Sequence, residues 1–93
     1  MGMTVILDDA DKVVGIFTDG DLRRALERGV DLLSSRMAEL MTHNPRTIGP
    51  NSLAAEAVEL MERYKVNHIV VVDDDMKLLG ALNMHDLLQA KVI

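Results

Sequence analysis

The chain has 93 residues, a net charge of −5, 48% hydrophobic residues, 2% aromatic residues and no cysteine. The negative charge argues against binding to nucleic-acid backbones or anionic membranes, and the low aromatic content argues against stacking on single strands. The lack of cysteine excludes disulfides and thiolate-bound metals. Because the sequence also lacks a membrane-length apolar run and a signal-peptide pattern, we expect a cytoplasmic protein with one modest core.

The first third of the sequence predicts a β-hairpin followed by a helix. Residues 3–7 form an apolar, β-branched run, residues 8–12 are a polar turn, and residues 13–17 form a second strand. Residues 18–21 (Thr-Asp-Gly-Asp) combine capping side chains with acidic first-turn residues, which is typical of a helix start. Gly29 suits the end of this helix.

The next stretch predicts a linker and a short helix. Residues 30–35 are interpreted as the linker, and Ser34 or Ser35 is the expected cap of a short helix that continues to Met41. Asn44-Pro45 then breaks this helix, because the residue before a proline disfavours helical backbone angles.

The last half of the chain predicts a strand, a helix, a hairpin and a final helix. Thr47-Ile48 is a very short strand, and Asn51 or Ser52 is the expected cap of the clearest helix. The apolar face of this helix is formed by residues spaced four positions apart, Leu53, Ala57 and Met61. Residues 69–72 and 78–82 predict a second hairpin, and residues 85–88 open the last helix.

Two stretches of the chain repeat each other at a constant offset of 80 − 15 = 65 positions. Val5–Gly15 is matched by Val70–Gly80 without a gap. The match continues at Asp21-Leu22 with Asp86-Leu87 and at Ala25 with Ala90. Two copies of this size predict a paired module rather than an array of repeats. Because the counterparts of residues 41–65 would precede Met1, we expect the chain to be a fragment whose first copy is incomplete.

The repeated motifs resemble the CBS domain, a module that usually works in tandem pairs. The second copy carries the full pattern, which comprises Met41-Thr42, Asn44-Pro45, Thr47-Ile48, Ala54, Ala57, Leu60-Met61, Val66-Asn67, Val71-Val72-Asp73, Leu79-Gly80 and His85-Asp86-Leu87-Leu88. The first copy carries only the stretch from Gly15 to Leu22. The resemblance implies an α/β (α+β) tandem CBS pair with pseudo-two-fold symmetry and a ligand cleft between its sheets. It divides the chain into a partial first motif (1–29), a linker with a short helix (30–40) and a complete second motif (41–93).

A narrower resemblance is to the CBS pair of arabinose 5-phosphate isomerases. It rests on Gly15 to Arg24 and on Met84-His85-Asp86-Leu87-Leu88. Those enzymes interconvert ribulose 5-phosphate and arabinose 5-phosphate, whose product feeds 3-deoxy-manno-octulosonate (Kdo) for lipopolysaccharide. In that family a sugar-isomerase domain precedes the CBS pair and performs the chemistry. Nothing in this chain resembles that domain, so the resemblance implies no catalytic residue here and makes the absent domain an expected partner.

The junction between the first hairpin and its helix is a candidate nucleotide site. First-turn amides of a helix favour phosphate, and Thr18 can add a hydroxyl donor. Asp21 can accept hydrogen bonds from a ribose diol, as acidic residues do in dinucleotide folds. The CBS resemblance implies phosphate and ribose contacts for this threonine and this aspartate. The alternative is that Thr18, Asp19 and Asp21 only cap the helix and complement its dipole.

The equivalent junction of the second copy contains Asn83, His85 and Asp86. Asp86 keeps the ribose role, and His85 can bind an anionic ligand when it is protonated. Asn83 replaces the threonine, which mildly favours a sugar nucleotide over an ordinary adenine nucleotide. The base side of the site is expected from Thr47-Ile48 and from Asn67-His68, although the latter pair also suits an exposed strand start.

We therefore expect a regulatory module that requires no cofactor and senses a phosphorylated nucleoside, either AMP or ATP or the sugar nucleotide CMP-Kdo. CBS pairs often dimerise through their helices, so a homodimer or a larger assembly is expected. The alternative function is a structural oligomerisation module without a ligand. The three histidines lie on separate predicted elements and predict no metal site. The acidic runs at 8–11 and 73–75 are interpreted as solvated turns.

Overall fold

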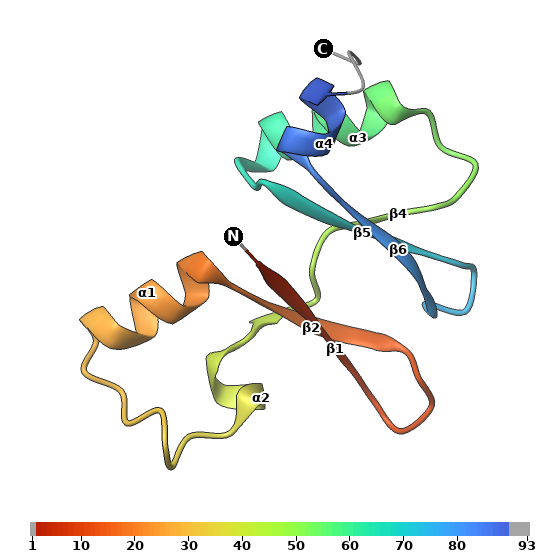
Figure 1. Ribbon diagram of the computed structural model, residues 1–93. Helices are drawn as coiled ribbons and strands as arrows, with labels where there is room; N and C mark the ends of the chain where they lie inside the picture. Colours follow the sequence, from red (N-terminus) through yellow and green to blue (C-terminus); the bar gives the residue numbers. More distant parts are fainter. Residues whose placement is uncertain (1, 90–93) are drawn as a thin grey trace. The chain divides into compact units, whose positions relative to one another are not determined.

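A computed structural model describes residues 2–89 of the chain and confirms the expected mixed α/β fold class (Figure 1). The chain divides into two compact units, residues 1–45 (unit 1) and 46–93 (unit 2), and each unit has a three-stranded sheet. The repeat position Ala90 lies outside the described residues. None of the described helices is long and apolar enough to cross a membrane.

Unit 1 has an antiparallel sheet whose middle strand contacts both helices of the unit. β1 (Met3–Leu7) and β2 (Val13–Thr18) form the predicted hairpin, and α1 (Asp19–Glu27) follows β2 directly. α2 (Met37–Leu40) leads into β3 (Thr42–His43), and the sheet order is β1-β2-β3. Because β2 contacts both α1 and α2, it positions the start of α1 beside the segment that precedes β3.

Unit 2 has a mixed sheet and two helices. β4 (Thr47–Ile48) pairs in parallel with β5 (His68–Val72), and β5 pairs in antiparallel with β6 (Leu78–Asn83). α3 (Ala54–Tyr64) connects β4 to β5, and α4 (Met84–Gln89) follows β6. The parallel pair needs α3 as its crossover connection, since parallel strands cannot be joined by a tight turn.

The core of unit 2 lies between the sheet and the two helices. Its buried residues are Ala57, Val58, Met61, Ile69 and Leu87. Ala57 and Met61 confirm the predicted apolar face of α3, whereas Leu53 precedes the helix and is exposed. Partly buried residues such as Ile48 and Leu82 extend this core across the sheet.

The two hairpins share one register as well as one sequence pattern. Met3 pairs with Thr18 in unit 1, and the residues 65 positions later, His68 and Asn83, pair in unit 2. Each ladder also shifts register at the equivalent place, just before its final pair. A shift of this kind is a β-bulge, which increases the local twist of the strand. The sequence repeat is therefore a repeat of backbone geometry.

The acidic hairpin loops are each held by their own first aspartate. The Asp8 carboxylate accepts the amides of Ala10 and Lys12 at 2.8 and 3.0 Å, and Asp73 accepts the two equivalent amides at the same distances. The backbone hydrogen bonds from Lys12 and Ala10 lower the pKa of the Asp8 carboxyl below its ordinary value. An aspartate that bonds to the backbone two residues further on is a typical turn former. These contacts agree with the interpretation of both acidic runs as turns.

The predicted cap of α2 is wrong. α2 begins after Arg36, whose backbone is extended and which makes no side-chain cap. The Ser34 and Ser35 hydroxyls instead donate to Asp31, at 3.0 Å to its carboxylate and 2.7 Å to its carbonyl. Serine side chains bond to the nearest acceptor, and here the preceding turn provides one.

The predicted cap of α3 is also wrong. The helix begins after Leu53 and not after Asn51 or Ser52. The Glu56 carboxylate accepts the Leu53 amide at 3.5 Å, which is the half of a capping box that needs no polar side chain at the cap position.

β3 is a strand that the sequence does not predict. Gly15 pairs with His43, and the Asn44 amide donates to the Val14 carbonyl at 3.3 Å. Residues 41–45, at the start of the predicted second motif, therefore pack in unit 1. A segment of two residues is too short to show the alternation of apolar and polar residues that indicates a strand. β3 is therefore recognisable only by its pairing with β2.

Candidate ligand-binding site

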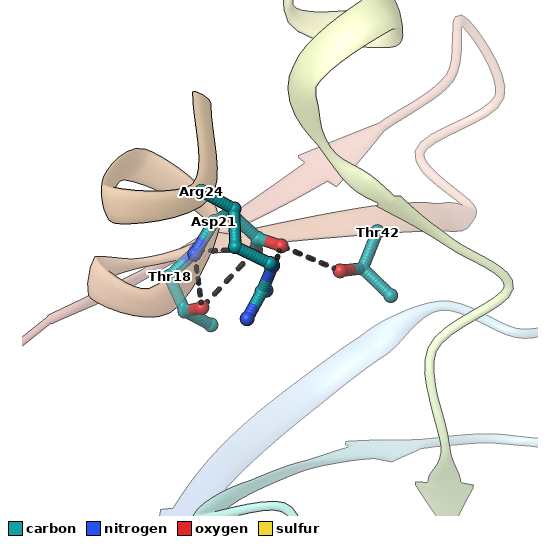
Figure 2. A network of polar contacts seen from close by, with 4 residues as sticks. All are labelled: Thr18, Asp21, Arg24 and Thr42. Carbon is teal, nitrogen blue, oxygen red and sulfur yellow. Dashed lines mark hydrogen bonds and ion pairs between the residues drawn. The ribbon is translucent and has the colours of Figure 1, made fainter. Parts of the chain in front are cut away.

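The Asp21 carboxylate, in the first turn of α1, is the centre of a polar network in unit 1 (Figure 2). Its Oδ2 atom accepts the Thr18 amide at 2.8 Å and the Thr18 hydroxyl at 3.1 Å. Its Oδ1 atom accepts an Arg24 guanidinium N–H at 2.7 Å and the Thr42 hydroxyl at 2.8 Å. The Thr18 oxygen accepts the Asp21 amide in return, so the two residues form a capping box.

Asp21 is only 6% exposed, and its neighbours stabilise its charged form. Burial raises the pKa of the carboxyl, but the hydrogen bonds from the Thr18 amide, the Thr42 hydroxyl, Arg24 and the Thr18 hydroxyl together outweigh burial. The net result is a pKa below the ordinary value. Thr18 and Asp21 therefore perform the capping role that was the alternative to ligand contact. A ligand that used Asp21 would have to displace Thr42 or Arg24.

Arg24 and Thr42 belong to this network, yet neither is among the predicted site residues. Arg24 lies three positions after Asp21 on the same helix, a spacing that places oppositely charged side chains together and could have identified it. Thr42 lies 21 positions away on β3. No local pattern connects it to Asp21, because its position depends on the pairing of β3 with β2.

Asp19 lies beside this network but makes a different contact. It is exposed, and its Oδ2 atom accepts the Gly2 amide at 3.1 Å. This bond joins the segment before β1 to the first turn of α1. Asp19 thus helps to hold the start of the hairpin against the helix, and the carboxylate of Asp21 has no part in that contact.

An open cleft of about 490 Å³ lies beside the Asp21 network. It is lined by residues of α1 and of the α2 region, namely Asp21, Arg24, Glu27, Arg28, Glu39, Leu40 and Met41. Its wall mixes both signs of charge with two apolar side chains. The pairing of Arg24 with Asp21 reduces the positive charge that the cleft could offer to a phosphate.

The equivalent junction in unit 2 also has a side chain that caps the helix, but its aspartate is exposed. The Asn83 side-chain oxygen accepts the Asp86 amide at 2.8 Å, as the Thr18 oxygen does for Asp21. Asp86 itself is exposed. Among residues 2–89, no donor equivalent to Thr42 or Arg24 bonds to the Asp86 carboxylate. Within this part of the chain, the Asp86 carboxylate is exposed and is not held as the Asp21 carboxylate is.

The sheet register places several predicted site residues of unit 2 on one face. His68 pairs with Asn83, and Thr47 pairs with Val70, two positions further along β5. Because paired residues share a face and alternate residues along a strand share a face, Thr47, His68 and Asn83 lie on the same side of the sheet. Ile48 lies on the other side and packs against the helix-covered core.

Asn67 and His85 lie at the margins of this junction. The Asn67 carbonyl accepts the Met84 amide at 3.0 Å, which joins the start of β5 to the start of α4. Asn67 and His85 are both exposed. The backbone of Asn67 thus supports the junction, and its side chain faces solvent.

Two equivalent hairpins, each followed directly by a helix with a capping residue and an aspartate three positions later, define the class of this protein. The sequence matches the CBS domain family over residues 2–28 and 37–93. The chain belongs to the CBS domain family.

Within that class the chain is similar to one kind of enzyme. It is 53% identical to arabinose 5-phosphate isomerase KdsD of Pseudomonas aeruginosa, 45% to KdsD of Yersinia pestis and 47% to KdsD of Escherichia coli K12, over all 93 residues in each case. These identities confirm the narrower resemblance to the CBS region of arabinose 5-phosphate isomerases. The chain spans 28% of the length of each of these relatives.

Solved CBS structures share the fold. The CBS domain pair of protein MJ0100, in complex with 5′-methylthioadenosine and S-adenosyl-L-methionine, has a TM-score of 0.84 and 26% identity over 97% of this chain and 69% of that chain. Protein PAE2072 of Pyrobaculum aerophilum, complexed with AMP, has a TM-score of 0.85 and 26% identity over 92% of this chain and 66% of that chain. CBSX2 in complex with AMP has a TM-score of 0.82 and 26% identity over 97% and 70% of the two chains.

Proposed function

We propose that this chain is the regulatory, nucleotide-sensing CBS module of an arabinose 5-phosphate isomerase. Identity of 45–53% to KdsD enzymes supports the parent enzyme, and complexes of similar CBS structures with AMP and S-adenosyl-L-methionine support the ligand class. The parent would be a cytoplasmic enzyme that converts ribulose 5-phosphate to arabinose 5-phosphate for Kdo and lipopolysaccharide synthesis. A sugar-isomerase domain outside this chain would perform that chemistry.

The ligand site in this proposal is the Asn83–Asp86 junction of unit 2, and the exposed Asp86 carboxylate is the observation that carries it. The Asp21 oxygens already accept bonds from Thr18, Arg24 and Thr42, so a ribose diol meets less competition at Asp86. Because the Asn83 oxygen accepts the Asp86 amide, its NH₂ group is left to donate to a phosphate.

Other residues of unit 2 complete the proposed site. His68 and Thr47 share the sheet face of Asn83 and would contact the base, while Asn67 and His85 flank the junction. Ile48 would act indirectly, because it packs in the core and holds β4 against β5. Thr18, Asp19 and Asp21 form the second, weaker site of the pair in this proposal.

The ligand is a phosphorylated nucleoside, for which AMP, ATP and CMP-Kdo are the three candidates. CMP-Kdo suits feedback control by a later product, and the asparagine at position 83 mildly favours it. Binding would act on the parent enzyme only if the ligand has different affinities for two arrangements of the module.

Calorimetric titration of the chain with AMP, ATP and CMP-Kdo tests this proposal. Asp86→Ala should weaken binding about 10- to 100-fold, because a hydrogen bond to a charged group contributes about 1.5–3 kcal/mol. Asp74→Ala is the matched control, since it removes the same charge from an exposed hairpin loop and should leave affinity unchanged. Absence of heat with all three ligands would refute the sensor role. A loss of binding in Asp21→Ala but not in Asp86→Ala would move the site to unit 1.

A role in assembly is the second candidate, and the exposed leucines of the helices favour it. Leu22 and Leu26 on α1 and Leu88 on α4 are exposed. Exposed apolar residues on helices suit a homodimer or a larger assembly. Light scattering should give a mass of at least two chains. An assembled protein that binds none of the three ligands would support the structural role alone.

A further inference from the structure

The guanidinium of Arg24 lies beside Gly20 and reaches back to Asp21 along α1 (Figure 2). It donates to Oδ1 of Asp21 at 2.7 Å. A Cβ atom added at Gly20 would lie 3.2 Å from Nη1 and 3.6 Å from Nη2 of the same guanidinium. Helical side chains point toward the start of their helix, so Arg24 reaches the first turn only if that turn leaves room for it. Gly20 provides this room.

The second copy of the repeat lacks both parts of this arrangement. At the offset of 65 positions, the counterparts of Gly20 and Arg24 are His85 and Gln89. A neutral glutamine forms no ion pair, and a histidine leaves no bare backbone beside it. Glycine is unfavourable within a helix, so its place in α1 is explained by the guanidinium that lies next to it. The arginine and its glycine are therefore a feature of unit 1 alone in the described part of the chain.

Arg24 is the donor to Asp21 that a ligand displaces most easily. Thr18 donates as part of the capping box, and Thr42 is placed by the pairing of β3 with β2. The Arg24 side chain is 59% exposed, and its release disturbs neither the helix cap nor the sheet. An ion pair with one exposed member contributes little, because water competes for it. A ligand hydroxyl that reaches Asp21 therefore takes the place of Arg24.

The cost of displacing Arg24 depends on what the ligand offers in return. A neutral diol gives the guanidinium no new acceptor, whereas a phosphate group accepts two of its N–H groups at once. Arg24 and Arg28 both line the cleft of about 490 Å³ beside Asp21, so a phosphate in this cleft would meet the guanidinium. Glu27 and Glu39 line it as well, but both are exposed, and salt screens their repulsion.

We propose that Arg24 determines the specificity of the unit 1 site by covering Asp21 until a phosphate group draws the guanidinium away. The Asp21 carboxylate then accepts ribose hydroxyls in the place of Arg24. Unit 1 thus binds a phosphorylated nucleoside and discriminates against the same nucleoside without its phosphate. The ligand class rests on the proposed function, and the discrimination by Arg24 goes beyond it.

Calorimetric titration in an Asp86→Ala background tests this role, because that substitution weakens the proposed site of unit 2. The ligands are AMP against adenosine and CMP against cytidine. Arg24→Gln, which introduces the side chain of the second copy, should strengthen nucleoside binding and weaken nucleotide binding. The ratio of the two affinities should fall at least about 10-fold, because a charged hydrogen bond to phosphate is lost. Arg23→Gln is the matched control, since Arg23 is an exposed neighbour outside the cleft lining.

The outcomes separate this inference from the proposed function. An unchanged ratio in Arg24→Gln, or nucleoside affinity that does not rise, would overturn the covering role. Binding to the unaltered chain but not to Asp86→Ala would also overturn it, and would leave the sensor function of unit 2 intact. Absence of binding to the unaltered chain refutes the proposed function, and the exchange of partners at Asp21 is then decided without a nucleoside.

Inorganic phosphate tests that exchange by itself. Added at constant ionic strength, with chloride as the reference anion, it should shift the NMR resonance of the Asp21 carboxyl carbon toward the position seen in Arg24→Gln. Phosphate should leave this resonance unmoved in Arg24→Gln and should shift it in Arg23→Gln as in the unaltered chain. A carboxylate that only caps α1 would not respond to phosphate. No shift in the unaltered chain would overturn the release of Asp21.

Discussion

Asp21 and Asp86 occupy equivalent positions of the repeat but have different surroundings. Asp21 is buried and accepts hydrogen bonds from Thr18, Arg24 and Thr42, whereas Asp86 is exposed. A carboxylate that is already satisfied stabilises its own unit, and a carboxylate that faces solvent can accept bonds from a ligand. The two copies therefore differ in how far the equivalent carboxylate is already bonded within its own unit.

Asp21 couples the stability of unit 1 to acidic pH. Its pKa is lowered in the folded protein, so its contribution is fully present above the unfolded aspartate value of about 3.9 and is lost as the pH falls through the folded value. We expect Asp21→Asn to weaken this acid dependence, measured as the free energy of unfolding in urea between pH 7 and pH 2. Asp9→Asn, in an exposed hairpin loop, should retain it. An identical acid dependence in both variants would contradict this role.

Gly15 and Gly80 should respond differently to the same substitution. Gly15→Ala forces Met41 to move, because its Sδ atom would lie 2.4 Å from the new methyl group. We expect a loss of about 1–3 kcal/mol in the free energy of unfolding, as is usual for overpacking. Gly80→Ala should be neutral or slightly stabilising, because it meets no atom and restricts the unfolded chain. Thermal denaturation of the two variants, compared side by side, decides this prediction.

Among the elements, β3 depends most on its tertiary partners. It is held by pairing with β2, by the bond from the Thr42 hydroxyl to Asp21, and by the His43 ring, which contacts the Ala38 carbonyl at 2.7 Å. Two residues of strand pairing are weak by themselves, so the side-chain contacts contribute much of its stability. Because β4 begins only a few residues later, β3 also defines where unit 1 ends.

Thr42→Val should loosen β3 without changing its strand propensity. The substitution keeps the branched shape and removes the hydroxyl that Asp21 accepts. We expect a loss of about 1 kcal/mol in stability and faster amide exchange at residues 41–44, because one buried acceptor loses a donor. Thr4→Val on the exposed side of β1 is the control and should leave both quantities unchanged. Unaltered exchange in Thr42→Val would show that the bond from Thr42 to Asp21 does not help to hold β3.

In the molecule as a whole, the two units differ in how much apolar core they contain. Most of the buried apolar residues lie in unit 2, where α3 and α4 cover one face of the sheet. The buried apolar side chains of unit 1 are Val13 and Ala25 in the described part of the chain. The polar network at Asp21 therefore contributes a larger fraction of the interactions that hold α1, β2 and β3 together in unit 1.

Met61→Ala should destabilise unit 2 strongly. The side chain is 1% exposed and lies among the largest buried groups of the chain. Removing it from a packed core leaves a cavity and should cost about 2–5 kcal/mol. Hydrogen exchange at Ile69 and Val70 reports the effect directly. Leu53→Ala, which truncates an exposed side chain just before α3, should change exchange there by less than about two-fold. Equal effects of the two substitutions would be inconsistent with a core at Met61.

The sequence by itself determined the features that depend on local patterns. The hairpin boundaries agree with the prediction to about one residue, and the two copies of the 65-position repeat form hairpins with the same register. Ala57 and Met61 are buried, as their spacing indicates. The family was also identifiable from the order and duplication of short motifs, and the match over residues 2–28 and 37–93 confirms it.

Only the tertiary structure decided which residues from separate segments meet. α2 begins after Arg36 while Ser34 and Ser35 bond to Asp31 in the preceding turn, and α3 begins after Leu53, whose amide donates to Glu56 in the first turn of the helix. The side-chain preferences of single residues do not predict either start. Thr42 reaches Asp21 because β3 pairs with β2, and no pattern within two residues encodes that pairing. Asp21 is buried and Asp86 is exposed because the segments that pack beside the two equivalent junctions differ. Equivalent sequences fold alike locally, and their chemistry then depends on the segment that packs beside them.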